Sequence, residues 1–308
     1  MSLSGIFSRN NLYYIVKPFI PRSLQICIRR KIINRQRQIF KDSWPIDNHA
    51  STKPEGWKGW PDKKKFALIL IHDVDTQKGH DKCSKIAEIE YPLGFHSTFF
   101  FVPERYKVSL KVIQELKEKG FGVGVHGLKH DGKLFKNKKM FSRRAKHINA
   151  ILKKWDTVGF SSPSTHRNFE WMHELNIEYA TTSFDTDPFE PQPEGVGTIF
   201  PFIVKNKYHQ YVELPYTLAQ DFSLFVLMRE KNIDVWKKKL DWIAENGGMA
   251  LINTHPDYMG FNGTVGNENY PYQYYVEFLT YLSNNYSGQY WHVLSKEMAS
   301  FWKNHVGK

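Results

Sequence analysis

Short apolar runs alternate with amphipathic stretches from residue 65 onward, and this alternation constrains the fold more than any other feature. The apolar runs have strand length, and the stretches between most of them carry apolar residues three or four positions apart, as helices do. This βα order predicts a parallel sheet flanked by helices, and about seven such units can close or nearly close a barrel. The predicted strands are 66–71, 96–102, 122–125, 158–161, 179–183, 211–214 and 249–253, and the clearest predicted helices are 108–119, 142–155, 235–245 and 272–282.

Two parts are expected, a basic N-terminal extension with its connection at 1–64 and the main domain at 65–308. Residues 1–41 carry nine Lys or Arg and no acidic residue, so they hold most of the net charge of +12. A helix capped by Ser23 is predicted there, with apolar residues every fourth position among arginines, namely Leu24, Ile28 and Ile32. These residues either pack onto the main domain while the arginines are solvated, or contact an anionic lipid surface.

The extension has two further implications. Lys17 and two prolines interrupt its apolar run, so we expect no signal peptide. No recognised nucleic-acid-binding motif accompanies the positive charge, so we expect no nucleic acid partner.

Polar residues that directly follow apolar runs are the candidate functional residues, because the active sites of parallel barrels lie at the C-terminal ends of the strands. Asp73 and Asp75 follow the run 66–71, and their spacing of two places them on the same side of an extended chain. A turn or helix cap would also explain aspartates at this position. His255 follows the run 249–253, where it could be a metal ligand, a general acid or a hydrogen-bonded loop residue.

A metal site built from histidines and a carboxylate, without cysteine, is also expected. His126 and His130 follow a glycine-punctuated strand, and if this segment turns helically both imidazoles share one face. Cys27 and Cys83 lie far apart, so neither a disulfide framework nor a cysteine-based zinc site is expected. Two histidines and one carboxylate, with open positions for water, form a workable hydrolytic zinc site.

These three segments, in this order and at these distances, resemble the polysaccharide deacetylase family, whose NodB-homology domain is a distorted (β/α) barrel. The resemblance covers roughly residues 65–300 and implies an α/β fold, a distorted (β/α)7-type barrel behind an N-terminal basic helical extension. The separated pair in His72-Asp73-Val74-Asp75 marks a divergent subgroup. The resemblance implies these roles: Asp73 as base, Asp75, His126 and His130 as metal ligands, and His255 as general acid. The intervening valine leaves a swap of the two aspartates open.

Two further motifs of the family match less well. An arginine shortly before a proline usually orients the base, whereas here the residues before Pro163 are Ser161 and Ser162, so a serine occupies the expected place. Arg167 is therefore the candidate catalytic residue that reaches the same carboxylate from the next turn. The acidic and aromatic motif that usually supports the acid histidine is assigned to residues 184–187, with Asp185 and Asp187.

The resemblance implies a metal-dependent hydrolase, with Zn²⁺ as the favoured cofactor, that removes N-acetyl groups from an acetamido sugar in a polysaccharide or its lipid-linked precursor. Candidate sugar-stacking residues near the mouth are Trp171, Tyr216 and Tyr258. Two alternatives remain, a catalytically inactive carbohydrate-binding relative and a hydrolase of a non-sugar amide. We expect a role in cell surface polysaccharide biosynthesis and a cytoplasmic location, with residues 1–41 consistent with a peripheral position at the inner membrane face.

Overall fold

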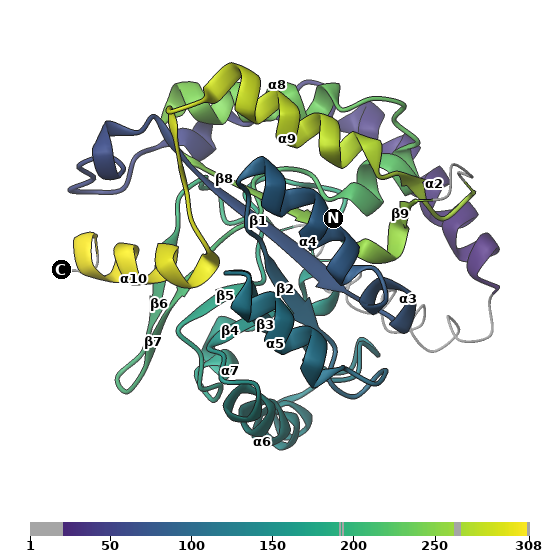
Figure 1. The fold of residues 1–308 in the computed structure, drawn as a ribbon, viewed down its shortest axis with the longest axis vertical. Helices are drawn as coiled ribbons and strands as arrows, with labels where there is room; N and C mark the ends of the chain where they lie inside the picture. The colour runs from purple at the N-terminus through teal and green to yellow at the C-terminus, as the bar shows by residue number, and fades with distance from the viewer. Residues whose placement is uncertain (1–20, 191, 193, 262–265, 307–308) are drawn as a thin grey trace.

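A curled, mostly parallel sheet forms the centre of the computed structural model, which describes residues 21–190, 192, 194–261 and 266–306 (Figure 1). Within these residues nine strands form this sheet: β1 (Phe66–Val74), β2 (Thr98–Phe101), β3 (Gly122–His126), β4 (Gly159–Ser161), β5 (Tyr179–Thr181), β6 (Phe202–Lys205), β7 (Gln210–Glu213), β8 (Met249–Thr254) and β11 (Tyr290–His292). The parallel strands follow the order β8-β1-β2-β3-β4-β5-β7. No ladder joins β7 to β8 in the described chain, so the barrel is incomplete. The predicted distorted (β/α) barrel is confirmed.

The two strands of this sheet that were not predicted lie outside this parallel order. β6 runs antiparallel along β7, and β11 pairs with the first residues of β1. Both are short and only partly buried, so their sequences lack the continuous apolar run of a central strand. β1, by contrast, is buried along its whole length and continues past the predicted end through Asp73.

Helices cover the sheet on opposite sides, with α8 and α9 together on one side and α6 on the other (Figure 1). Their bounds are α3 (Gln77–His80), α4 (Cys83–Glu90), α5 (Leu110–Glu118), α6 (Lys138–Lys154), α7 (Phe169–Met172), α8 (Asp234–Asn246), α9 (Gln273–Tyr286) and α10 (Ser295–His305). α5 and α6 begin where Ser109 and Asn137 accept a hydrogen bond from the backbone N–H three residues on. The four predicted helices of this region are confirmed, with shifted ends.

Shorter elements complete the chain. They are the 3₁₀ turns η2 (Asn48–Ser51), η3 (Pro61–Lys63), η4 (Tyr91–Leu93), η5 (Pro163–Thr165) and η7 (Pro256–Tyr258), the π-helical segment η6 (Phe222–Met228), and the paired strands β9 (Met259–Gly260) and β10 (Tyr270–Pro271).

The predicted basic helix is present as α2 (Arg22–Ile39), while residues 1–20 of the extension lie outside the described chain. Its predicted cap is wrong, and of the two alternatives for its apolar residues, packing onto the main domain does not hold. Pro21 occupies the N-cap position and no side chain caps the helix, so Ser23 is not the cap. The helix also does not pack through Leu24, Ile28 and Ile32, which are exposed, but through Ile26 and Ile33.

The described part of residues 1–64 shares one hydrophobic core with the barrel. Ile26, Ile33 and Trp60 are buried in the same cluster as the strands. The ring of Trp57 lies 5.1 Å from that of Trp302 in α10, which anchors the connection. The domain boundary at residue 65 remains a prediction. In the described chain, no helix has both the length and the apolar character needed to cross a bilayer.

Candidate metal centre

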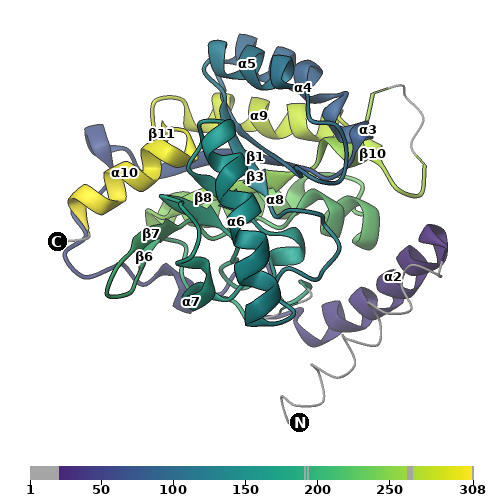
Figure 2. The ribbon, with the colours of Figure 1, turned by 90° about the horizontal axis from the view of Figure 1, so that it is seen from below.

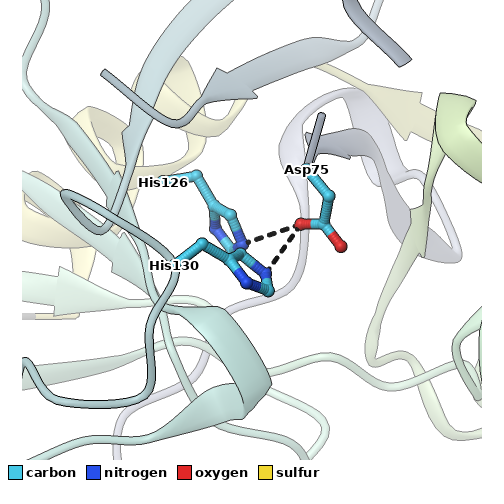
Figure 3. Close-up of side chains that lie close together, drawn as sticks. All are labelled: Asp75, His126 and His130. Carbon is cyan, nitrogen blue, oxygen red and sulfur yellow. Dashed lines mark ion pairs between the residues drawn. The ribbon is translucent and has the colours of Figure 1, made fainter. Parts of the chain in front are cut away.

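Asp75, His126 and His130 converge beyond the C-terminal ends of β1 and β3 (Figure 3). Their ligand atoms all lie within 4.8 Å of one another. Oδ1 of Asp75 is 2.9 Å from Nε2 of His130 and 3.4 Å from Nε2 of His126. This oxygen is buried and accepts no hydrogen bond within the described chain. A buried carboxylate oxygen without a donor, facing two imidazole nitrogens, fits a divalent metal of the zinc type.

Electrostatics keeps the Asp75 carboxyl ionised. Burial alone would raise its pKa, but His130 and His126 act in the opposite direction and hold the pKa well below its usual range. An ionised carboxylate is the form that ligates a metal.

A loop, not a helix, brings the two histidines together. His126 ends β3, and the following residues form bends, so the segment does not make the helical turn that was considered for it. Gly127 and His130 both have left-handed backbone angles, with φ of 59° and 53°. A Cβ on Gly127 would also lie 2.7 Å from Cδ of Pro163, so a glycine is required there. The reversal turns His130 back toward His126.

Ser161 links the metal cluster to the neighbouring aspartate. Its hydroxyl lies 2.5 Å from Nδ1 of His126 and donates a hydrogen bond of 2.7 Å to Oδ1 of Asp73. With Nδ1 engaged in this way, Nε2 of His126 is left to face Asp75. The serine found in place of the family's usual arginine therefore contacts the candidate base directly.

Asp73 is held by two further side chains whose contact with it was not predicted from the sequence. Its Oδ2 accepts hydrogen bonds from Nδ2 of Asn253 at 2.9 Å and from the hydroxyl of Tyr216 at 3.3 Å. Asn253 stands near the end of the buried strand β8, two residues before His255. A carboxamide in an otherwise apolar run is the one sequence signal that pointed to it.

Arg167 lies apart from this carboxylate. Its guanidinium donates to the backbone carbonyls of Thr165 and Glu194 and stacks over the ring of Phe184 at 5.4 Å. Among the described residues, the hydrogen bonds to the Asp73 side chain come from other groups. The hydrogen bond to Asp73 that was expected of Arg167 is thus made by Ser161, Tyr216 and Asn253. A catalytic role of Arg167 stays a prediction.

His255 is paired with an aspartate that the sequence reading did not identify. Its Nδ1 lies 2.6 Å from Oδ1 of Asp221, and its backbone N–H donates to Oδ2 of the same residue at 2.8 Å. Burial lowers the pKa of His255, but Asp221 and the nearby charges of Asp75 and Asp73 outweigh it and raise the pKa to about 10. The imidazole is therefore a protonated acid at neutral pH.

The assignment of 184–187 as the support of this histidine is wrong. Oδ2 of Asp185 pairs with Nζ of Lys239 at 2.6 Å, and Oδ1 of Asp187 accepts from the backbone N–H of Phe189 at 2.9 Å. Asp221 lies instead at the start of η6, where it also accepts from the backbone N–H of Phe222.

A buried polar network ties β1 to β8 and two helices. Nδ1 of His72 is 2.7 Å from the hydroxyl of Thr254, and its Nε2 is 2.7 Å from Oε1 of Glu90. Tyr275 in α9 donates to the same Glu90 oxygen at 2.5 Å. Because His72 precedes Asp73 directly, the network fixes the strand that carries both aspartates.

No protein-family model and no curated protein matches this sequence. Among solved structures, it is similar to a putative polysaccharide deacetylase from Mycobacterium smegmatis, with 16% identity, a TM-score of 0.61, and coverage of 82% of this chain and 95% of the other. A probable polysaccharide deacetylase from Pseudomonas aeruginosa PAO1 matches with 14% identity, a TM-score of 0.62, and coverage of 85% and 99%. The Puue allantoinase matches with 15% identity, a TM-score of 0.63, and coverage of 86% and 99%. The chain therefore has the fold of the NodB-homology polysaccharide deacetylases, as its motifs implied.

Proposed function

We propose that this protein is a metal-dependent hydrolase that removes N-acetyl groups from an acetamido sugar, in a polysaccharide or in its lipid-linked precursor. One arrangement carries the proposal: a carboxylate base, Asp73, and a protonated acid, His255, accompany the metal-ligand cluster. A base, an acid and a metal are the three components that amide hydrolysis without a covalent intermediate requires. The fold shared with polysaccharide deacetylases supports the same reaction class.

Each side chain has a distinct role in this proposal. Asp75, His126 and His130 hold a divalent metal, most suitably Zn²⁺, which when bound acidifies water and polarises a carbonyl. Asp73 accepts the proton of the attacking water, with Ser161 and Asn253 fixing its oxygens. His255 protonates the departing amine, because an amide anion is a very poor leaving group.

The sugar-binding residues are also part of the proposal. The ring of Tyr258 lies 5.3 Å from that of His255 and is partly exposed, so it can stack on a sugar ring beside the acid. Tyr216 is buried against Asp73, and the ring of Trp171 packs 6.0 Å from that of Phe141, so neither is as well placed to stack on a sugar. A lipid-linked precursor would place the enzyme in the cytoplasm at the inner membrane face.

A second candidate is hydrolysis of a non-sugar amide. The similarity to an allantoinase of the same fold favours it, because the fold alone does not select the sugar. An inactive carbohydrate-binding relative is the third candidate, and Ser161 in place of the usual arginine favours that reading.

Acetate release from N-acetylated oligosaccharides and lipid-linked precursors tests the proposal, and hydrolysis of allantoin and its analogues, followed separately by loss of the substrate amide, is the non-sugar arm. Zinc-loaded protein, chelated protein and the His126→Ala, His130→Ala double variant are compared, and bound metal is measured alongside. Acetate release that needs metal and both histidines supports the deacetylase. Turnover of the non-sugar amides alone supports the second candidate, and stoichiometric metal without turnover supports the third. Folded protein that binds no metal would contradict the metal-ligand roles assigned to Asp75, His126 and His130.

A further inference from the structure

α2 turns an apolar stripe away from the barrel. Eight large hydrophobic side chains are exposed in the described chain, and four of them lie on this helix: Leu24, Ile28, Ile32 and Ile39, at 50, 38, 52 and 73%. With 3.6 residues per turn, these four fall within an arc of about 80°, and the buried Ile26 and Ile33 lie on the opposite side. Figure 2 shows α2 at the periphery of the molecule.

The charges of α2 divide between the same two faces. On the inner side, Arg30 donates to the backbone carbonyls of Val226 at 2.9 Å and Asn267 at 2.7 Å, and Arg37 pairs with Glu230 at 2.6 Å. On the outer side, Lys31 and Arg35 are exposed and lie within or beside the apolar arc. No acidic residue occurs in residues 1–41. The outer face of α2 therefore combines exposed apolar side chains with charged side chains that are all positive.

We propose that the outer face of α2 docks on an anionic lipid bilayer. Apolar side chains along one arc enter the boundary between headgroups and acyl chains, while flanking lysines and arginines meet lipid phosphates. A second copy of this chain bound through the same face would bring like charges together, which disfavours a twofold interface. The inference does not rest on the proposed enzymatic activity.

Docking in this way orients the metal centre. Nη2 of Arg22 lies 3.4 Å from the hydroxyl of Tyr258, whose ring is next to His255. The guanidinium of Arg29 stacks over the ring of Phe222 at 5.0 Å, and Phe222 packs against Tyr258 at 4.6 Å. The first turns of α2 thus lie at the rim of the metal centre, so a bilayer on the outer face is close to that rim.

The test is flotation of the full-length protein with vesicles of phosphatidylcholine alone and of phosphatidylcholine with phosphatidylglycerol, at low and high salt. The key variant is Leu24→Ser, Ile28→Ser, Ile32→Ser. Leu110→Ser is the matched control, because Leu110 is as exposed as Ile32, at 52% each, but lies on α5. Circular dichroism and sedimentation velocity verify folding and oligomeric state for each protein.

We expect wild type and the Leu110→Ser control to float with anionic vesicles, less so at high salt, and the triple variant to bind about tenfold more weakly or worse. Two results overturn the proposal directly: wild type that floats with neither vesicle, and a triple variant that floats like wild type. Wild-type dimers that become monomers in the triple variant, without vesicle binding, would assign the stripe to a second copy instead.

Discussion

Asp221→Asn tests how the acid histidine is kept protonated. In the wild type the pKa of His255 is about 10, against an ordinary value of 6.5, with Asp221 as the strongest raising influence. That difference corresponds to about 5 kcal/mol in favour of the imidazolium. The asparagine keeps the size of the side chain but removes its charge, so the pKa of His255 should fall to about 6.5 or below because burial is then less opposed.

The rate effect follows from the protonated fraction. At pH 8 a group with a pKa of 6.5 is only about 3% protonated, whereas one with a pKa of 10 is almost fully protonated. We expect kcat/KM of the variant at pH 8 to fall about 30-fold and to recover as the pH is lowered toward 6. A bound metal cation lowers the pKa of His255 in the wild type and in the variant alike. The difference between the two proteins is therefore the quantity to compare.

The assay is acetate release against pH, with the His255 ring followed by NMR and assigned with His255→Gln. Asp241→Asn is the control, because both aspartates accept hydrogen bonds from tyrosines: Asp221 from Tyr270, and Asp241 on α8 from Tyr281 and Tyr286. Its profile should match the wild type. A folded, metal-loaded Asp221→Asn protein with a wild-type pH profile would refute the reasoning about His255.

Three other predictions follow from the geometry. His130→Ala removes one of three protein ligands and should weaken zinc binding by more than about 100-fold, measured by competition with a chromophoric chelator; unchanged affinity would exclude this residue from the site. Ser161→Ala removes a hydrogen bond to Asp73 and should lower kcat by about 10- to 100-fold when zinc is supplied at saturation; a wild-type kcat contradicts its positioning role. Glu90→Ala breaks the buried His-Glu-Tyr network and should destabilise the fold by about 3–5 kcal/mol in urea unfolding, whereas the exposed Glu88→Ala should have little effect.

The sequence predicted most of the barrel and the convergence of the metal cluster. Central parallel strands are covered on both faces, so their continuous apolar runs stand out, as in β1. The C-terminal ends of such strands meet at one edge, which is why Asp75 and His126 could be expected to lie together although the chain separates them. The loop geometry of His130 could not be predicted, because four-residue spacing fits a helix and a left-handed turn alike.

The partners of the catalytic residues were harder to predict for a different reason. Asp221 follows no predicted strand and meets His255 only because η6 folds back toward the end of β8, a tertiary contact without periodicity. The orientation of α2 on the barrel was also hard to predict. Its apolar residues occur on two faces, through Ile26 and Ile33 as well as Leu24, and spacing alone does not say which face meets the barrel.

The Ser161 hydroxyl has a thermodynamic consequence, because it has a single proton to donate. That proton is directed to Asp73, so the same oxygen is left to accept from Nδ1 of His126, which fixes the ring tautomer with the Nε2 lone pair toward Asp75. A change that reorients Asp73 therefore also disturbs the ligand nitrogen of His126, and by reciprocity a metal held by His126 stabilises the observed orientation of Asp73.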